Sequence, residues 1–421
     1  MQRRQFLALL SSTNWPSFRG PNATGTLPSA DPPLQWDRPL WTTPIPGAGH
    51  ASPVVWGDSV YVITAVPAGA PTTVDLKAND RVVFAEDRVP HTWKLLALHR
   101  ATGRIRWQSD LHQATPRQAR HSRGSYANAT PATDGRRIVV SLWQEAIACV
   151  DAKGRLRWKK DIRPADPKAA LDAASSPVID GNLVFLQCDW SPGGFLLALD
   201  LDSGNEVWRK PRAEGHSWTT PAVYRSPQGE SVLVANSSRR ILGYRTRDGA
   251  ELWSFDNSTT QPWDRIPAPV VTGDLVIVTG GAPDRPIYAI RTSASGEVKP
   301  EHLAWTTGRG APYMSTPLAL DGLLYTVQGN GILTAYELST GARLYQQRLG
   351  CQVSASPVGV PDRVCLLAED GTLFSIKSGR TYELLAKASA GEPCLATPAL
   401  SGRLLIARGI SRVAAFGQPA K

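Results

Sequence analysis

The sequence predicts an all-β fold, an eight-bladed β-propeller of four-stranded antiparallel blades, and three observations lead to this prediction. A Ser, Thr or Ala precedes a Pro at the start of eight short apolar runs. Asp-Gly or Gly-Asp turns then separate short β-branched strands, and a Trp recurs four residues after a Gly. A period of about 40–50 residues made of short strands is typical of a radial repeat, in which each unit packs on its neighbours.

The eight X-Pro pairs mark where each repeat begins. They are Ser52-Pro53, Thr130-Pro131, Ser176-Pro177, Thr220-Pro221, Ala268-Pro269, Thr316-Pro317, Ser356-Pro357 and Thr397-Pro398. The gaps between the prolines are 78, 46, 44, 48, 48, 40 and 41 residues. Each pair therefore opens the first strand of one blade.

Within a repeat, the pattern predicts four strands. Gly57-Asp58 and Asp180-Gly181 each join two apolar runs, which is a strong hairpin signal. A third strand ends in Ala-Leu or a variant, and the fourth carries the recurring aromatic residue. Because large rings are well suited to packing between blades, we interpret these residues as structural. They are Trp107, Trp158, Trp208, Trp253 and Trp305.

The two ends of the chain complete each other. The last repeat stops after Phe416 without a fourth strand, and residues 39–43 supply a spare strand that carries Trp41. We expect this N-terminal strand to complete the last blade, which leaves no open sheet edge. The resulting division is a lead-in at 14–38 over the outside or one face, a single propeller at 39–417 and a tail at 418–421.

Two insertions interrupt the repeat, at residues 66–92 and 109–129. The first lengthens a turn between the second and third strands, and the second lengthens the link into the next blade. Both connections emerge at the same end of a propeller, and long loops there are often functional. The second insertion carries a cluster that would favour an anionic ligand or partner, unless its members are simply solvated. The cluster consists of Arg117, Arg120, His121 and Arg123.

Residues 1–13 contain Arg3-Arg4 followed by Phe6 and Leu7, which looks like a truncated twin-arginine export signal. Their apolar stretch is shorter than the 7–15 residues of a signal peptide core. Two interpretations remain, export to the periplasm and a cytoplasmic protein. No run approaches the ~20 apolar residues of a membrane span.

The composition constrains the partners. The chain of 421 residues has 46 basic and 36 acidic side chains, hence a formal net charge of +10. The basic residues do not follow one face with interleaved aromatic residues, so we expect no nucleic acid partner. We also expect a monomeric protein. The five cysteines include no CxxC pair, and a bridge between Cys351 and Cys394 stays open.

The repeat resembles the pyrroloquinoline-quinone (PQQ)-type propeller motif Ala-x-Asp-x-x-Thr-Gly-x-x-x-Trp, which residues 198–208 match closely. The opening residues 14–22, the Gly-His segment at 46–53 and residues 126–135 are similar to PQQ-binding-like β-propeller proteins of planctomycetes and acidobacteria. The resemblance covers roughly residues 14–416. Such repeats occur in quinone-dependent dehydrogenases and in an outer-membrane assembly scaffold, so the resemblance implies the fold more strongly than the activity.

A quinone dehydrogenase of this type implies PQQ, Ca²⁺ and a vicinal Cys-Cys pair. The chain has no Cys-Cys pair and no Cys-x-x-Cys-His haem motif. Candidate oxygen ligands for Ca²⁺ form no recognisable set. They are Glu145, Asp189, Asn236 and Asp284. No cofactor is therefore predicted, and PQQ with Ca²⁺ belongs to the alternative function. Hydrolase motifs and a P-loop are also absent from the sequence.

The best candidate site follows from position in the repeat. Residues just before each first strand converge at one mouth of the central channel, and turns between second and third strands join them. The predicted ligand-binding set is His50, Tyr126, Asn128, Asp189, Trp190, His216, Trp218 and Tyr313, with no catalytic or metal-binding residue. One ligand would require His50, Asp189 and His216 to lie within ~10 Å of one another.

The resulting hypothesis is a non-catalytic propeller that binds a protein or ligand as a scaffold in the cell envelope. A quinone-dependent dehydrogenase is the first alternative. A carbohydrate- or small-molecule-binding propeller is the second, because Trp and Tyr side chains at the mouth can stack on sugars. Histidines that cap loops are the simpler explanation for the Gly-His pairs at His50 and His216.

Overall fold

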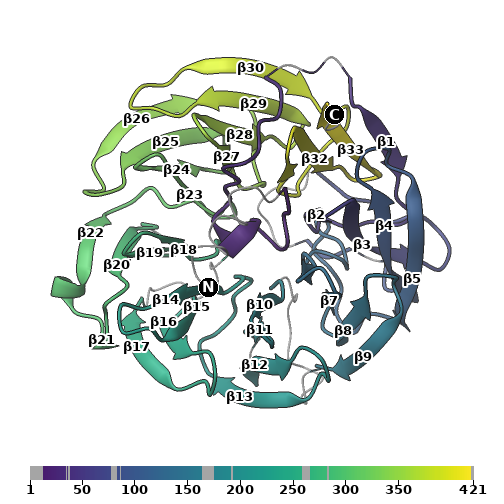
Figure 1. Cartoon of the computed structure of the whole chain (residues 1–421), viewed down its shortest axis with the longest axis horizontal. Helices are drawn as coiled ribbons and strands as arrows, with labels where there is room; N and C mark the ends of the chain where they lie inside the picture. The colour runs from purple at the N-terminus through teal and green to yellow at the C-terminus, as the bar shows by residue number, and fades with distance from the viewer. Residues whose placement is uncertain are drawn as a thin grey trace.

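The computed structural model describes residues 13–34, 36, 38–76, 83–85, 87–163, 175–190, 193–257, 266–281 and 284–418. Its strands form eight separate antiparallel sheets arranged radially around one axis (Figure 1). The predicted all-β, eight-bladed propeller is confirmed. The twin-arginine-like residues at the start of the chain, up to residue 12, lie outside the described residues.

Each blade contains four antiparallel strands, ordered here from the axis outward. Blade 1 contains β2 (Val54–Trp56), β3 (Ser59–Pro67), β4 (His91–His99) and β5 (Ile105–Ala114), and blade 2 contains β6 (Ala132–Thr133), β7 (Arg137–Leu142), β8 (Ala146–Asp151) and β9 (Leu156–Asp161). Blade 3 contains β10 (Val178–Asp180), β11 (Leu183–Cys188), β12 (Gly194–Asp200) and β13 (Glu206–Arg212). Blade 4 contains β14 (Ala222–Arg225), β15 (Ser231–Ala235), β16 (Arg240–Arg245) and β17 (Glu251–Asp256).

Blades 5 to 8 repeat the pattern, and the last one borrows a strand from the start of the chain. Blade 5 contains β18 (Val270–Thr272), β19 (Leu275–Thr279), β20 (Ile287–Arg291) and β22 (Leu303–Thr307), and blade 6 contains β23 (Leu318–Leu320), β24 (Leu323–Val327), β25 (Ile332–Glu337) and β26 (Arg343–Arg348). Blade 7 contains β27 (Val358–Val360), β28 (Arg363–Leu367), β29 (Thr372–Lys377) and β30 (Leu384–Ser389). Blade 8 contains β31 (Ala399–Ser401), β32 (Leu404–Arg408), β33 (Arg412–Gly417) and β1 (Trp41–Pro44).

The closure of the ring is as predicted. Strand β1 pairs antiparallel with β33, with Trp41 opposite Ala415 and Pro44 opposite Arg412. The N-terminal strand thus supplies the outermost strand of blade 8, next to blade 1 (Figure 1). Because both ends of the chain are needed for this sheet, neither the first nor the last blade is left incomplete.

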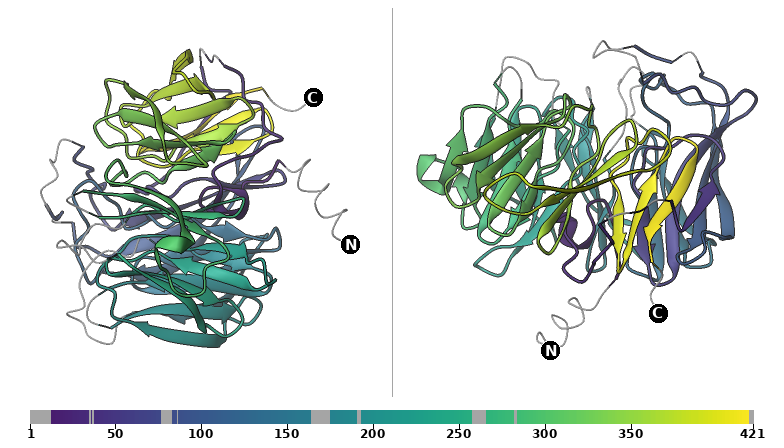
Figure 2. Two further views of the ribbon diagram at one scale, coloured as in Figure 1. Left: turned by 90° about the vertical axis from the view of Figure 1, so that its left-hand side faces the viewer. Right: turned by 90° about the horizontal axis from the view of Figure 1, so that it is seen from above.

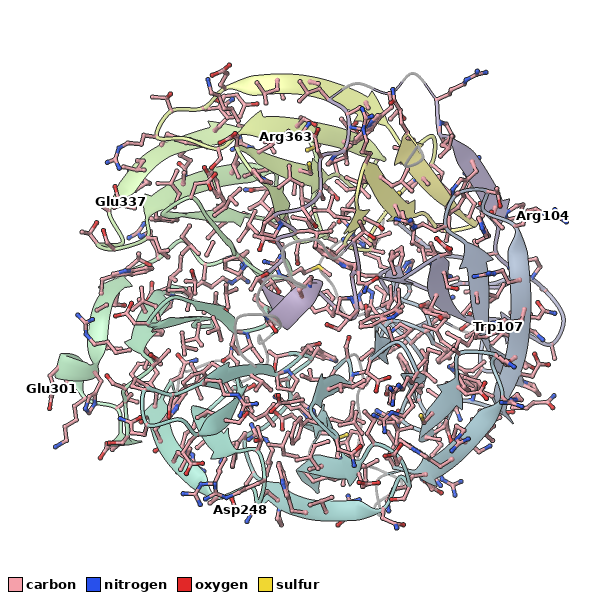
Figure 3. All side chains as sticks on the ribbon, viewed as in Figure 1. Arg104, Trp107, Asp248, Glu301, Glu337 and Arg363 are labelled. Atoms are coloured by element: carbon pink, nitrogen blue, oxygen red, sulfur yellow. The ribbon has the colours of Figure 1, made fainter. Side chains whose placement is uncertain are left out.

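The recurring Trp residues join neighbouring blades. Their indole Nε1–H groups donate to backbone carbonyls of the next blade: Trp41 to Arg100 (2.8 Å), Trp107 to Ala152 (3.2 Å), Trp158 to Leu201 (3.1 Å), Trp208 to Thr246 (2.8 Å) and Trp305 to Leu338 (2.8 Å). Figure 3 shows Trp107 on the outer strand β5. The rings therefore contribute both apolar packing and one directional bond at each junction.

Blade 4 departs from the pattern. Trp253 is buried, but its Nε1–H donates 2.9 Å to the hydroxyl of Tyr224 in its own blade. The following blade has the strand β21 (Gly296–Glu297), which pairs in parallel with β17, where the other repeats have a simple turn. Blade 4 consequently has a fifth strand, because the linker of the next repeat covers its outer edge.

The Ser or Thr before each Pro links the inner strands. The side-chain oxygen of six of these residues accepts a backbone N–H from the corresponding residue of the preceding blade. The bonds run from Ser52 to Thr130 (2.9 Å), Thr130 to Ser176 (2.9 Å), Ser176 to Thr220 (3.0 Å), Ala268 to Thr316 (3.0 Å), Thr316 to Ser356 (2.9 Å) and Ser356 to Thr397 (2.9 Å). This chain of bonds explains why a hydroxyl recurs at this position, and Ala268, which lacks one, interrupts it.

We expect Thr316→Val to lower the free energy of unfolding by about 1–2 kcal/mol, because the buried Ala268 N–H loses its acceptor while the side-chain volume is kept. Urea denaturation of the full chain measures the effect. Thr340→Val is the matched control, since the Thr340 hydroxyl accepts only an exposed bond from Ala342. Equal effects for the two variants would contradict a stabilising role for the chain of bonds.

The lead-in closes one end of the ring axis. Trp15 pairs with Val55 of β2, and the amide of Leu27 donates to Gly359 of β27 (3.0 Å). The 3-10 helix η1 (Pro21–Ala23) lies over the centre of the ring in Figure 1. Arg19, which is fully buried, donates to the carbonyls of Pro357 (2.7 Å) and Pro317 (2.6 Å). The lead-in therefore crosses one face and inserts a side chain among the inner strands.

The two insertions meet at the opposite end, as expected from the strand count. The Ser122 amide donates to the Val83 carbonyl (2.7 Å), and the Ala85 amide donates to the Arg120 carbonyl (2.9 Å). Figure 2 (right) shows these blue loops rising above the ring, away from the purple lead-in. Two loops that are distant in the sequence thus form one composite surface, which we call the insertion face (residues 66–76, 83–85, 87–92 and 109–129).

Helical structure in the described part of the chain is limited to η1 and η2 (Pro300–His302). Neither of these helices has the length or the apolar character required to cross a bilayer. The bridge between Cys351 and Cys394, which the sequence left open, is not formed, since both are free thiols. Burial raises the pKa of the Cys394 thiol to about 12, which makes it a poor nucleophile at neutral pH.

Candidate functional site

The predicted site residues fall into two groups on different blades. Asp189, His216 and Trp218 belong to blades 3 and 4, where Asp189 forms an isolated bridge with Ser217. His50 lies between blades 8 and 1, where its neighbouring charges are arginines. Two polar clusters lie at the insertion-bearing end, one around Asp189 and one around His50.

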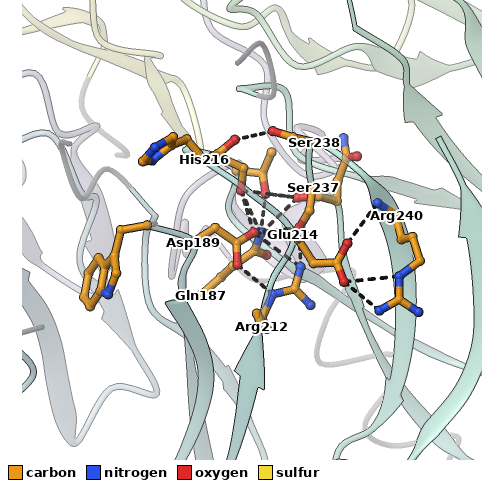
Figure 4. A network of polar contacts seen from close by, with 12 residues as sticks. Gln187, Asp189, Arg212, Glu214, His216, Ser237, Ser238 and Arg240 are labelled. Carbon is orange, nitrogen blue, oxygen red and sulfur yellow. Dashed lines mark hydrogen bonds and ion pairs between the residues drawn. The ribbon is translucent and has the colours of Figure 1, made fainter. Parts of the chain in front are cut away.

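The first cluster is centred on the buried carboxylate of Asp189, at the end of β11 (Figure 4). Arg212 donates to it from Nε (2.6 Å) and Nη2 (3.3 Å). The hydroxyls of Ser217 (2.8 Å) and Ser237 (2.6 Å) and the amide of Gln187 (2.7 Å) also donate to Asp189. We call these residues the Asp189 network. Because five donors already surround the carboxylate, it has little capacity left for a ligand.

The side-chain nitrogens of Arg212 also have hydrogen-bond acceptors. Its side chain is fully enclosed, and its Nη1 donates 2.7 Å to the hydroxyl of Tyr244. Desolvation is the largest single influence and lowers the pKa of Arg212, but Asp189, Tyr244 and Glu214 together outweigh it and raise this pKa above its usual value. The ion pair lies within blade 3, and its bonds to the hydroxyls of Ser217, Ser237 and Tyr244 join blade 3 to blade 4. Burial lowers the pKa of the neighbouring His216, so its imidazole is neutral at pH 7.

A second ion pair extends the network outward. The buried Glu214 accepts from Arg240 at 2.7 Å and 3.2 Å (Figure 4). Beside it lies an open cavity of about 470 Å³ on the outer side of blade 4. Its lining consists of Ala213, Glu214, Arg239, Arg240, Ser254, Asp256 and Glu297. The lining is charged with both signs and lacks aromatic residues, so it does not resemble a sugar- or quinone-binding pocket.

The second cluster surrounds His50, directly before β2. The His50 backbone amide donates to the Ala127 carbonyl (3.1 Å), while its ring Nε2 is buried without a hydrogen-bond partner. Burial and the positive charges of Arg408 and Arg120 lower the pKa of His50 to about 3. The imidazole is therefore neutral at physiological pH. Arg408, at the end of β32, donates from Nε to the Gly49 carbonyl (2.7 Å).

The arginines of the second insertion are mostly engaged within the protein. Arg120 is 1% exposed and donates to Asp87 (2.6 Å) and to the carbonyls of Gly124 (2.7 Å) and Thr73 (2.7 Å). Arg123 forms a 2.6 Å ion pair with Glu369 from the β28–β29 turn. Arg120 thus holds the insertion face together from inside and does not present its charge to a partner, contrary to the solvated arrangement considered for the sequence. Arg117 lies near Glu145.

The four predicted aromatic residues lie in different environments. Tyr126 is buried and makes edge-on contacts with His91 (4.7 Å) and Trp143 (5.1 Å). Trp190 is also buried, against Phe195. Both therefore pack in the core. Trp218 is half-buried, and Tyr313 stacks under the guanidinium of Arg285 (4.9 Å). Asn128 accepts bonds from Ser125 and shapes the local loop.

The residues do not fit the Ca²⁺ site that a quinone dehydrogenase of this fold would need. The oxygens of Asp189 are taken up by Arg212 and by neutral donors. Glu145 lies on blade 2, and Asp284 is exposed on blade 5. Among the residues that the structure describes, no three His, Cys, Asp or Glu side chains are grouped as metal ligands.

Residues that sequence analysis missed carry much of both clusters. Gln187, Arg212, Ser237, Glu369 and Arg408 were not singled out. Four of them share one signal, a polar or charged residue within two positions of the end of an apolar second strand: Gln187, Ser237, Glu369 and Arg408. In a propeller, that position of the second strand lies at the insertion-bearing end. The signal identifies candidates, but it does not identify their partners.

Comparisons with known proteins point to one family. A family model described as outer membrane protein assembly factor BamB matches residues 67–210 and 300–416. Among curated proteins, the outer membrane protein assembly factor BamB of Bordetella pertussis is 33% identical over 181 residues. This match covers 40% of the chain and 42% of the relative, so the aligned part spans less than half of that protein.

Solved structures confirm the fold. A europium-containing methanol dehydrogenase is similar with a TM-score of 0.70, at 13% identity over 97% of this chain and 92% of the other. BamB from Moraxella catarrhalis is similar with a TM-score of 0.56, at 13% identity over 83% of this chain and 98% of the other. At this level of identity, the resemblance in shape does not distinguish an enzyme from a scaffold.

Proposed function

Because the chain belongs to the family of the outer membrane protein assembly factor BamB, we propose that it is a non-catalytic scaffold that takes part in outer membrane protein assembly from the periplasm. The observation that carries this proposal is the insertion face. Two long loops are joined there by backbone hydrogen bonds and by the buried Arg120–Asp87 pair. A preorganised surface of this kind favours protein binding, because little loop entropy is lost on association.

The insertion face also exposes apolar side chains. Val83 is 43% exposed and Phe84 is 47% exposed, and the backbone of Phe84 is bridged to His121 in the second insertion. Exposed aromatic residues on an ordered loop are typical anchors of protein interfaces. A partner protein would cover these two side chains, whereas the Asp189 network and the core aromatic residues serve the stability of the scaffold.

Deleting the gene in the source bacterium should lower the amount of folded outer membrane β-barrel protein, since one assembly factor would be lost. The measurement is the heat-modifiable fraction of these proteins in gels of outer membrane preparations. Complementation with the wild-type chain should restore it. The Phe84→Asp variant should fail to do so, because a buried carboxylate opposes association.

Leu156→Asp is the matched control, since Leu156 is an exposed apolar residue (52%) on β9, away from the insertion face. It should complement like the wild type. An unchanged folded fraction after deletion would argue against a role in assembly. Full complementation by Phe84→Asp would instead argue against the insertion face as the docking surface. Fractionation of the same cells tests the periplasmic location.

A further inference from the structure

Arg408 differs from the other buried arginines. The structure describes five buried arginines, of which Arg19 bonds backbone carbonyls and Arg120, Arg212 and Arg363 pair with carboxylates. Arg408 is 1% exposed, yet both its Nη1 and its Nη2 lack a hydrogen-bond partner. A guanidinium cannot lose its charge as a lysine can, so the cost of leaving its donors unpaired is large.

A second unpaired group lies beside it. Arg408 Nε donates to the carbonyl of Gly49 (2.7 Å), and the next residue is His50, whose Nε2 is also buried and unpaired. A Cβ on Gly49 would lie 2.6 Å from Arg408 Nη2, so only glycine lets the guanidinium approach this loop. Two elements, the end of β32 and the loop before β2, thus bring unsatisfied polar atoms together.

The surrounding charges do not balance. Arg408, Arg120 and Arg123 all act on His50, and among the described residues Arg120 and Arg123 each have a carboxylate as an ion-pair partner. Asp87 pairs with Arg120, and Glu369 pairs with Arg123. Glu392, which also acts on Arg408, is bonded to Arg412 and Ser411. One positive charge therefore stays uncompensated in this buried cluster.

We propose that Arg408 and His50 form a binding site for one small oxyanion, a carboxylate or a phosphate group, between blades 8 and 1. The fork of a guanidinium matches such an oxyanion, which would accept bonds from Nη1 and Nη2 and supply the missing negative charge. The site lies beneath the insertion face, because Arg120 and Arg123 belong to the second insertion. Ligand binding would therefore stabilise the part of the scaffold on which docking is proposed.

Thermal unfolding of the full chain tests the proposal, with chloride replaced at constant ionic strength by acetate in one series and by inorganic phosphate in another. At least one of these anions should raise Tm in a saturable manner, since a ligand that binds the folded state stabilises it. In Arg408→Met, the half-saturating concentration should increase roughly tenfold or more, because the charged donors are lost. The two series distinguish a carboxylate from a phosphate site.

Arg363→Met is the control, since Arg363 is also buried but pairs with Asp31. It should keep the anion response of the wild type. If Arg408→Met does not fold, crystals of the wild-type chain soaked in selenate should show an anomalous peak beside Arg408. The absence of a saturable rise over chloride in the wild type would overturn the proposal. A wild-type response in Arg408→Met, or a selenate found only elsewhere, would also overturn it.

Discussion

Replacing Asp189 by Asn should lower the free energy of unfolding by about 3–5 kcal/mol, because it leaves the buried guanidinium of Arg212 without its counter-charge. The Asp189 carboxylate also accepts from Gln187, Ser217 and Ser237, and an amide cannot accept from all of them. Urea denaturation followed by circular dichroism measures the loss. The effect is expected to be among the largest for a polar substitution in this chain.

The double variant Asp189→Asn/Arg212→Met makes the test specific. If the loss comes from an uncompensated charge, removing Arg212 as well should restore part of the stability, so the two single effects should not add. Asp202→Asn is the matched control, since Asp202 is an exposed partner of Arg137 and its loss should cost at most about 1 kcal/mol. Additive effects at Asp189 and Arg212 would contradict a coupled pair.

The architecture was predictable because its determinants are periodic. The hydroxyl before most of the eight prolines accepts a bond from the preceding blade, and the Trp of most repeats packs on the next blade. A constraint that acts at every junction leaves the same residue at the same position in each repeat. The missing strand of the last repeat then had one source, the strand that contains Trp41.

The candidate sites were predictable only in position. Residues before the first strands do lie at the insertion-bearing end, but their partners come from strand ends and turns that differ between blades. Arg19 and Pro357, for example, are 338 residues apart and meet only because the ring brings the lead-in to its axis. No local pattern encodes such pairs. The burial of Tyr126 under the insertions likewise depends on loops whose sequences are not repeated.

Replacing Trp208 by Ala should also lower the free energy of unfolding by about 3–5 kcal/mol, because it leaves a cavity at the junction of blades 3 and 4. The ring packs against Phe185 (5.8 Å between centroids) and is bonded to the Thr246 carbonyl. Gly249 in the next blade lies under it with φ +67, and a Cβ there would approach the ring to 2.9 Å. The turn cannot close over the cavity without losing this backbone conformation.

Trp208→Phe separates the two contributions. Phe keeps most of the apolar packing but cannot donate to Thr246, so its cost should be about 1–2 kcal/mol, the value of one buried hydrogen bond. Leu156→Ala, an exposed apolar truncation, should change stability by less than about 0.5 kcal/mol. Urea denaturation of the four proteins gives this order. A Trp208→Ala variant as stable as Leu156→Ala would contradict a stabilising role of the Trp208 ring at the junction of blades 3 and 4.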